Sequence, residues 1–150
     1  MAESKVNWLT YPSATSHLTT ELNSLANAGR KLGAAVTTTR DQYMDVELSL
    51  AAQGSARSAG AAVELYLLPS VDGSNYAYGA DAGPDPAGTH LAGLFQFDAA
   101  TTARLDNVVG IFVPAGNWKL MVINRTGQAF AASANTLKYT LYDDVIQAQA

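Results

Sequence analysis

Three carboxylates in strand-like stretches are the residues of this chain whose types and spacing could do chemistry. Asp45 and Glu47 alternate with apolar residues, and Glu64 occupies the same kind of polar position in a later alternating stretch. A pair of carboxylates can hydrolyse a glycosidic bond when burial and spacing separate their pKa values. The same alternation is typical of a solvated sheet face. We therefore expect an ordinary sheet face here and assign no catalytic residue.

The histidine and serine residues of the chain belong to no metal-binding or nucleophile motif, and cysteine is absent. His17 and His90 stand far apart and belong to no HxH or HExxH spacing, so a histidine metal centre is not expected. The chain has no cysteine, and no Gly-x-Ser-x-Gly sequence marks a nucleophilic serine. The segment GSARSAG lacks the glycine spacing and the Lys-Ser/Thr pair of a phosphate-binding loop. We predict a protein that is not an enzyme and holds no cofactor.

Oxygen ligands that suit Ca²⁺ gather in one acidic segment. They are the side chains of Asp72, Asn75, Asp81 and Asp85. Their spacing matches no EF-hand loop, and Asp-Gly and Pro-Asp-Pro are ordinary turn formers. We therefore expect turns in this segment, and no metal site.

Aromatic side chains outside the alternating stretches are the best candidates for contact with a partner. Two tyrosines lie in the weakly patterned segment that ends near residue 90, and two aromatic residues lie near the N-terminus. Exposed tyrosines serve both protein contacts and sugar stacking. They could instead fold back over the edge of the domain, because tyrosine burial is commonly intermediate. The candidate partner-contact residues are Trp8, Tyr11, Tyr76, Tyr78 and His90.

Stretches with a period of two residues must position these side chains. The clearest runs from Tyr43 to Ala51, and another runs from Ala61 and stops at Pro69. Further candidate strands cover residues 17–27, 29–36, 91–97, 103–113, 117–124 and 135–142, and a glycine- and serine-rich flexible loop is expected at 53–60. About eight strands separated by turn signals, without an amphipathic helix, predict a single antiparallel β-sandwich. We place an extended N-terminal arm at 1–16, the sandwich at 17–142 and a C-terminal tail at 143–150.

The composition and net charge of the chain limit the kinds of partner that we expect it to bind. The net charge is −4, and no lysine or arginine occurs between Arg57 and Arg104, which argues against nucleic-acid binding. No apolar run approaches the roughly 18 residues of a membrane span, and MAESKVNWLT has no apolar run of a signal peptide. Charged residues are only 15% of the chain, so small residues must cover some of its surface. Such a surface suits burial against other protein subunits, and equally a plain surface domain.

Three segments resemble a group of small virion proteins of tailed bacteriophages. The segments are TYPSATSHLTTELNSLANAGRKLGAAV, VELYLLPSVDGSNYAYG and VPAGNWKLMVINRTGQAFAASANTLKY, and the similarity extends over roughly residues 8–142. The most specific pieces are LYLLPSVDGSNY and GNWKLMVINRTGQA. These pieces are structural signatures, so the resemblance informs the protein's placement more than any mechanism.

The resemblance implies a capsid decoration, or cement, protein with a jelly-roll-like β-sandwich. Such a protein would be made in the host cytoplasm, bind the major capsid protein on the outer surface of the head, and form a homotrimer. Its contacts would come from the N-terminal arm and from the loop at residues 75–90. A homotrimer would also bury Leu68, Met121 and Ile123, which occupy nominally outward positions. No nucleic acid or membrane partner is expected.

Two other functions stay open from the residues. Exposed aromatic side chains on a sandwich also fit a carbohydrate-binding module, and an accessory module of the tail or of a head fibre could share the virion resemblance. A glycosidase built on the three carboxylates requires a concave site between them.

Overall fold

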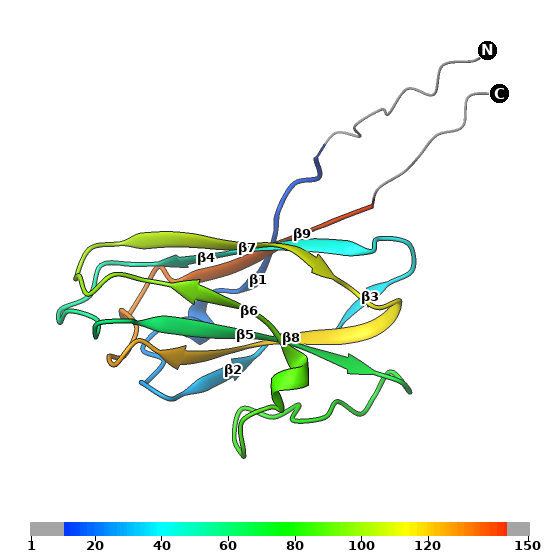
Figure 1. Ribbon diagram of the computed structural model, residues 1–150, viewed down its shortest axis with the longest axis horizontal. Coiled ribbons are helices and arrows are strands. Elements are labelled where there is room, and N and C mark those ends of the chain that lie inside the picture. The colour runs from blue at the N-terminus through cyan, green and yellow to red at the C-terminus, as the bar shows by residue number, and fades with distance from the viewer. Residues whose placement is uncertain (1–10, 144–150) are drawn as a thin grey trace, which may run out of the picture.

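Two antiparallel sheets account for nearly all the regular structure in residues 11–143, the part of the chain that the computed structural model describes (Figure 1). Sheet A has the strand order β1 (Thr15–Leu18), β9 (Thr136–Tyr142), β4 (Tyr43–Leu50) and β7 (Arg104–Phe112). Sheet B has the order β2 (Arg30–Leu32), β8 (Gly116–Arg125), β5 (Ala62–Ser70) and β6 (Leu91–Gln96), and β3 (Val36–Thr38) also pairs with β8. Two short 3₁₀ turns, η1 (Thr20–Leu22) and η2 (Gly88–His90), complete the elements.

The chain passes repeatedly from one sheet to the other, and the resulting strand order is that of a jelly roll. β2 and β3 pair with successive stretches of β8, so nine strands fill eight positions. The predicted antiparallel, jelly-roll-like β-sandwich is thus confirmed. Within the described residues, no helix is long and apolar enough to cross a membrane.

The core lies between the two sheets and follows the alternation of the sequence. In β4, Met44, Val46, Leu48 and Leu50 face inward and are buried, while the residues between them are partly exposed. Trp118 of β8 is fully buried on the opposite side of the core. Burial of each large apolar side chain contributes about 1.5–3 kcal/mol, so this alternation sets the register of the strands.

The predicted strand at residues 17–27 is wrong beyond Leu18. The chain turns there into η1, and the Ser24 amide donates a 3.0 Å hydrogen bond to the Ala131 carbonyl. Positive φ angles at Ser24 and Ala28 exclude a continuous strand. The polar residues of this segment therefore form turns.

The predicted strand at residues 29–36 is interrupted at Gly33. The imidazole of His17 occupies the space beside this glycine, and a Cβ atom at residue 33 would lie 1.9 Å from His17 Nε2. The segment therefore divides into β2 and β3 on either side of Gly33. β5 is longer than predicted. The sequence predicted that this strand stops at Pro69, whereas β5 continues through Pro69 to Ser70. β6 pairs with β5 only as far as Tyr66, so one flank of Pro69 has no strand that needs its missing N–H group.

Candidate functional site

Aromatic side chains form a row across the outer face of sheet A. Tyr43 lies between Phe112 of β7 and Tyr142 of β9, with ring centroids 6.5 Å and 5.8 Å away. Tyr11, in the segment before β1, extends the row with its centroid 5.9 Å from that of Tyr142. The two end rings are the most accessible, since Tyr11 is 57% and Phe112 is 64% exposed. The row therefore offers an aromatic ring to solvent at each end.

Asp45 fixes the position of this row. Its carboxylate accepts hydrogen bonds from the hydroxyl of Tyr11 at 2.6 Å, the hydroxyl of Tyr142 at 3.1 Å and the backbone N–H of Gly110 at 2.8 Å. Gly110 has a φ of +69° and lies where the register between β4 and β7 shifts. Desolvation and the hydrogen bond to Asp45 raise the pKa of Tyr11 to about 12. Tyr11 thus remains a protonated donor at neutral pH.

A polar row lies on the same face, closer to the middle of the sheet. Asn107, Glu47 and Lys138 are register partners on β7, β4 and β9. The ammonium of Lys138 contacts Glu47 Oε1 at 3.4 Å. Tyr11 and Thr140 border the same depression, a groove with a volume of about 150 Å³. We call it the sheet A groove.

Large apolar side chains are exposed along one edge of the sandwich, where β6 and β7 lie against each other (Figure 1). Gly93 permits this approach, because a Cβ atom there would lie 2.4 Å from Cγ1 of Val108. Eight large hydrophobic side chains are exposed in residues 11–143, and five of them belong to these two strands. The five define the apolar rim: Leu91, Leu94, Leu105, Val109 and Phe112.

A second groove, of about 470 Å³, opens where β6 begins. Its lining includes His90 and Leu91 on one side and Phe112 on the other, with Pro69 and Pro114 near the end of the sandwich. The ring of Tyr78 meets that of His90 edge-on at 6.1 Å. Two of the predicted contact residues, Tyr78 and His90, therefore come together at the apolar rim, although they are 12 positions apart in the sequence.

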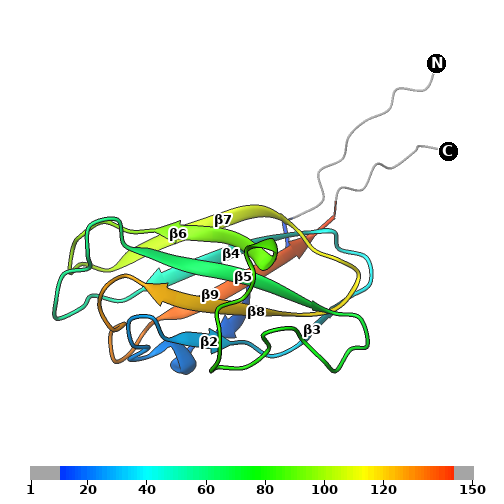
Figure 2. The same ribbon diagram turned by 60° about the horizontal axis from the view of Figure 1, so that its bottom comes forward.

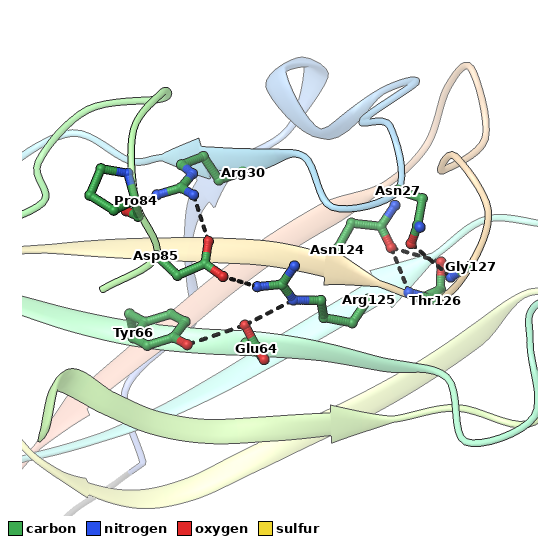
Figure 3. A network of polar contacts seen from close by, with 10 residues as sticks. All are labelled: Asn27, Arg30, Glu64, Tyr66, Pro84, Asp85, Asn124, Arg125, Thr126 and Gly127. Carbon is green, nitrogen blue, oxygen red and sulfur yellow. Dashed lines mark hydrogen bonds and ion pairs between the residues drawn. The ribbon is translucent and has the colours of Figure 1, made fainter. Parts of the chain in front are cut away.

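The loop between β5 and η2 lies against the outer face of sheet B (Figures 1 and 2). Asp85 forms ion pairs with Arg30 of β2 and Arg125 of β8, and Arg125 also contacts Glu64 of β5 (Figure 3). Asp81 adds an ion pair with Lys31 at 2.6 Å. Four side chains on this face form a second apolar cluster, all of them buried: Tyr66, Leu68, Met121 and Ile123.

This burial corrects the expectation that Leu68, Met121 and Ile123 are exposed in the single chain and would be buried by a homotrimer. Each of these side chains is 0% exposed in the single chain. Period-two alternation placed them outward, and the sequence contained no signal that the acidic loop returns over them. Within the loop, the ring of Tyr76 is partly buried and its centroid lies 4.5 Å from the ammonium of Lys119.

The two remaining predicted contact residues both lie near the N-terminus. Tyr11 is exposed and joins the aromatic row, whereas Trp8 lies outside the described residues. Three residues of the aromatic row were not among the predicted contact residues: Phe112, Tyr43 and Tyr142. The sequence did contain a signal for one of them, because the alternation of β4 places Tyr43 on the same outward face as Asp45.

The three carboxylates considered for catalysis do not share a site. Asp45 and Glu47 lie on the outer face of sheet A, whereas Glu64 lies on sheet B and accepts a hydrogen bond from Tyr66. Asp72 accepts bonds from the backbone N–H groups of Ser74 and Asn75, which together with the Asn75 amide lower its pKa strongly. Within residues 11–143 no group of three histidine or acidic side chains could hold a metal ion.

The chain was compared with family models, curated proteins and solved structures. No family model matches the chain, and no curated protein matches it. Among solved structures, the chain is similar to the C-terminal CBM6 of LamC, a marine laminarinase from Zobellia galactanivorans. The TM-score is 0.49 and the identity 12%, over 87% of this chain and 93% of that one.

Proposed function

We propose that the chain is a non-enzymatic structural protein of a bacteriophage virion, and specifically a capsid decoration protein that binds the outside of the head. The apolar rim is the observation that carries this proposal. Exposed apolar side chains on two neighbouring edge strands favour a protein neighbour, since a free edge of this kind promotes association. The resemblance of LYLLPSVDGSNY and GNWKLMVINRTGQA to virion proteins supplies the class of neighbour.

The other edges of the sandwich are built differently. β1 has four residues and β2 and β3 have three each, and the loop carrying Asp81 and Asp85 is attached beside β2. Short or covered edge strands resist further pairing. The long strands β6 and β7 are thus the side best suited to the major capsid protein or to other copies in a homotrimer.

Binding to a shell also suits the chemistry of the carboxylates. Asp45 holds the aromatic row, Glu64 is paired with Arg125, and Glu47 with Lys138. Each has a structural partner, which supports a non-catalytic role. On a symmetric shell, many copies of a modest contact gain affinity through effective concentration.

The test uses purified particles and a pair of matched variants. Mass spectrometry of mature virions should find the protein in many copies, and reconstruction of the particles should place it on the head. Added back to shells that lack it, a Val109→Glu variant should bind at least about 100-fold more weakly than the wild type, because the charge enters the centre of the rim. Val71→Glu is the control, since Val71 is a fully exposed apolar residue in the loop after β5 and does not belong to the rim.

Two results would overturn the proposal. One is the absence of the protein from mature particles, or its location on the tail or a fibre. The other is equal binding of the wild type and the Val109→Glu variant to the shell.

A further inference from the structure

We propose that the sheet A groove binds one neutral pyranose ring of a glycan. This function goes beyond the proposed capsid role and does not depend on it. The groove crosses the middle of sheet A, between Asn107 on β7 and Lys138 on β9. Its lining contains the hydrogen-bonding groups and the aromatic ring that a sugar requires.

The polar row supplies donors and acceptors to hydroxyl groups. The side-chain amide of Asn107 is exposed and makes no hydrogen bond to any residue in 11–143, so both its donor and its acceptor are available. Glu47 and Lys138 contact each other at 3.4 Å, a long distance for a charged hydrogen bond, and both are about one-third exposed. A carboxylate and an ammonium that are held side by side can accept from one hydroxyl and donate to its neighbour.

Tyr11 supplies the aromatic wall. Its hydroxyl is bound to Asp45 at 2.6 Å and its ring packs on Tyr142, so the ring is oriented before any ligand arrives. Preorganisation of this kind reduces the entropic cost of binding. The ring is nevertheless 57% exposed, which leaves apolar surface for the C–H face of a sugar.

Charge and size select the ligand. Asp45 and Glu47 outnumber Lys138 in the groove, so a carboxylated or sulfated sugar would meet net repulsion. The volume of about 150 Å³ is well below the roughly 300–1,000 Å³ of pockets for drug-sized ligands. The groove therefore holds a single ring of a neutral glycan, with any further units lying outside it.

Affinity for one ring should be in the millimolar range, about −4 kcal/mol. The direct measurement is a two-dimensional amide NMR titration of the full chain with glucose, galactose, mannose and maltotriose, each to about 20 mM, and with the single-ring acids glucuronate and galacturonate as acidic probes. We expect at least one neutral sugar to shift the amides of residues 45–47, 107 and 138–140, and the acidic probes to leave them unchanged.

Two variants with matched controls locate the site. Tyr11→Ala and Asn107→Ala should each weaken the titration about tenfold, whereas Tyr78→Ala and Gln96→Ala, at exposed positions outside the groove, should not change it. All four substitutions are at accessible side chains, so the native amide spectrum verifies folding in each case. The inference is overturned if no neutral sugar shifts these amides, if the acidic probes bind as well, or if the groove variants bind like the controls.

Discussion

The hydroxyl of Tyr11 donates a 2.6 Å hydrogen bond to the carboxylate of Asp45, 34 positions later in the sequence. This contact attaches the segment before β1 to the middle of sheet A. Because Asp45 also accepts from Tyr142 and Gly110, one carboxylate connects that segment to three strands of the sheet, β4, β7 and β9. Asp45 thus orients Tyr11, the aromatic ring that lines the groove.

The pKa of Tyr11 reports this contact in solution. Asp45→Asn removes the negative charge and weakens the acceptor, so the pKa of Tyr11 should fall from about 12 towards 10. It should stay somewhat above 10, because desolvation is the largest cause of the rise and is unchanged. An NMR titration of ring-labelled tyrosine measures both values. Equal pKa values in the two proteins would show that the contact is not formed in solution.

The close approach of β6 and β7 should be sensitive to one added methyl group. Gly93→Ala places a Cβ atom 2.4 Å from Cγ1 of Val108, a distance that forces the two strands apart. We expect a loss of about 1–3 kcal/mol in the free energy of unfolding, the usual cost of overpacking, measured by urea denaturation. Gly54→Ala is the control, because no atom lies within 4 Å of the Cβ position there. A Gly93→Ala variant as stable as the control would contradict the close contact.

Much of the fold could be predicted from the sequence, because alternation has a direct physical cause. Residues such as Met44 and Val46 face the core whenever their neighbours Asp45 and Glu47 face water, so strand and register follow together. The rule fails on sheet B, where Tyr66 and Leu68 are buried on the opposite face. Their cover depends on ion pairs formed across 40 positions or more, which local pattern does not encode.

Residues 53–60 form a loop, as their glycine and serine content predicts, but a charged side chain of this loop is buried. Arg57 in this loop is only 2% exposed, and its guanidinium donates to the carbonyls of Asp98 and Thr102 and lies over the ring of Phe97. A charged residue can be buried when backbone acceptors surround it, and those acceptors come from distant turns. The candidate groove has the same origin, since its strand residues meet through the pairing of β4 with β7 and β9, and Tyr11 joins them through Asp45.

The attachment of the long loop should depend on Asp85. The Asp85→Ala variant leaves Arg30, whose side chain is only 9% exposed, with the Pro84 carbonyl as its remaining loop contact. We expect a loss of about 1–3 kcal/mol in the free energy of unfolding, the typical cost of removing one partner of a mostly buried polar group. The loop should also become more sensitive to protease, since the cluster around Leu68 would be less well covered. Asp41→Ala, at a carboxylate without an ion pair in residues 11–143, should change neither measurement.

Stability should fall on mild acidification because of His17. Burial lowers the pKa of His17 below 6.5, and its Nε2 atom has no hydrogen-bond partner in residues 11–143. The unfolded chain therefore binds this proton at a higher pH than the folded chain. Stability is fully present above about pH 6.5, and decreases as the pH falls from there to the pKa of the folded state, with a slope of up to about 1.4 kcal/mol per pH unit.

Urea denaturation between pH 5 and 8 isolates this effect. The lowered pKa values of Glu21, Asp81 and Asp98 reduce stability only as the pH falls through about 4.5 and below. The His17→Phe variant keeps the edge-on ring contact with Tyr139 and cannot titrate, so its stability should be flat over this range. His90→Gln should retain the slope of the wild type. A slope that survives in the His17→Phe variant would assign the pH dependence to another group and show that His17 is not buried in its neutral form.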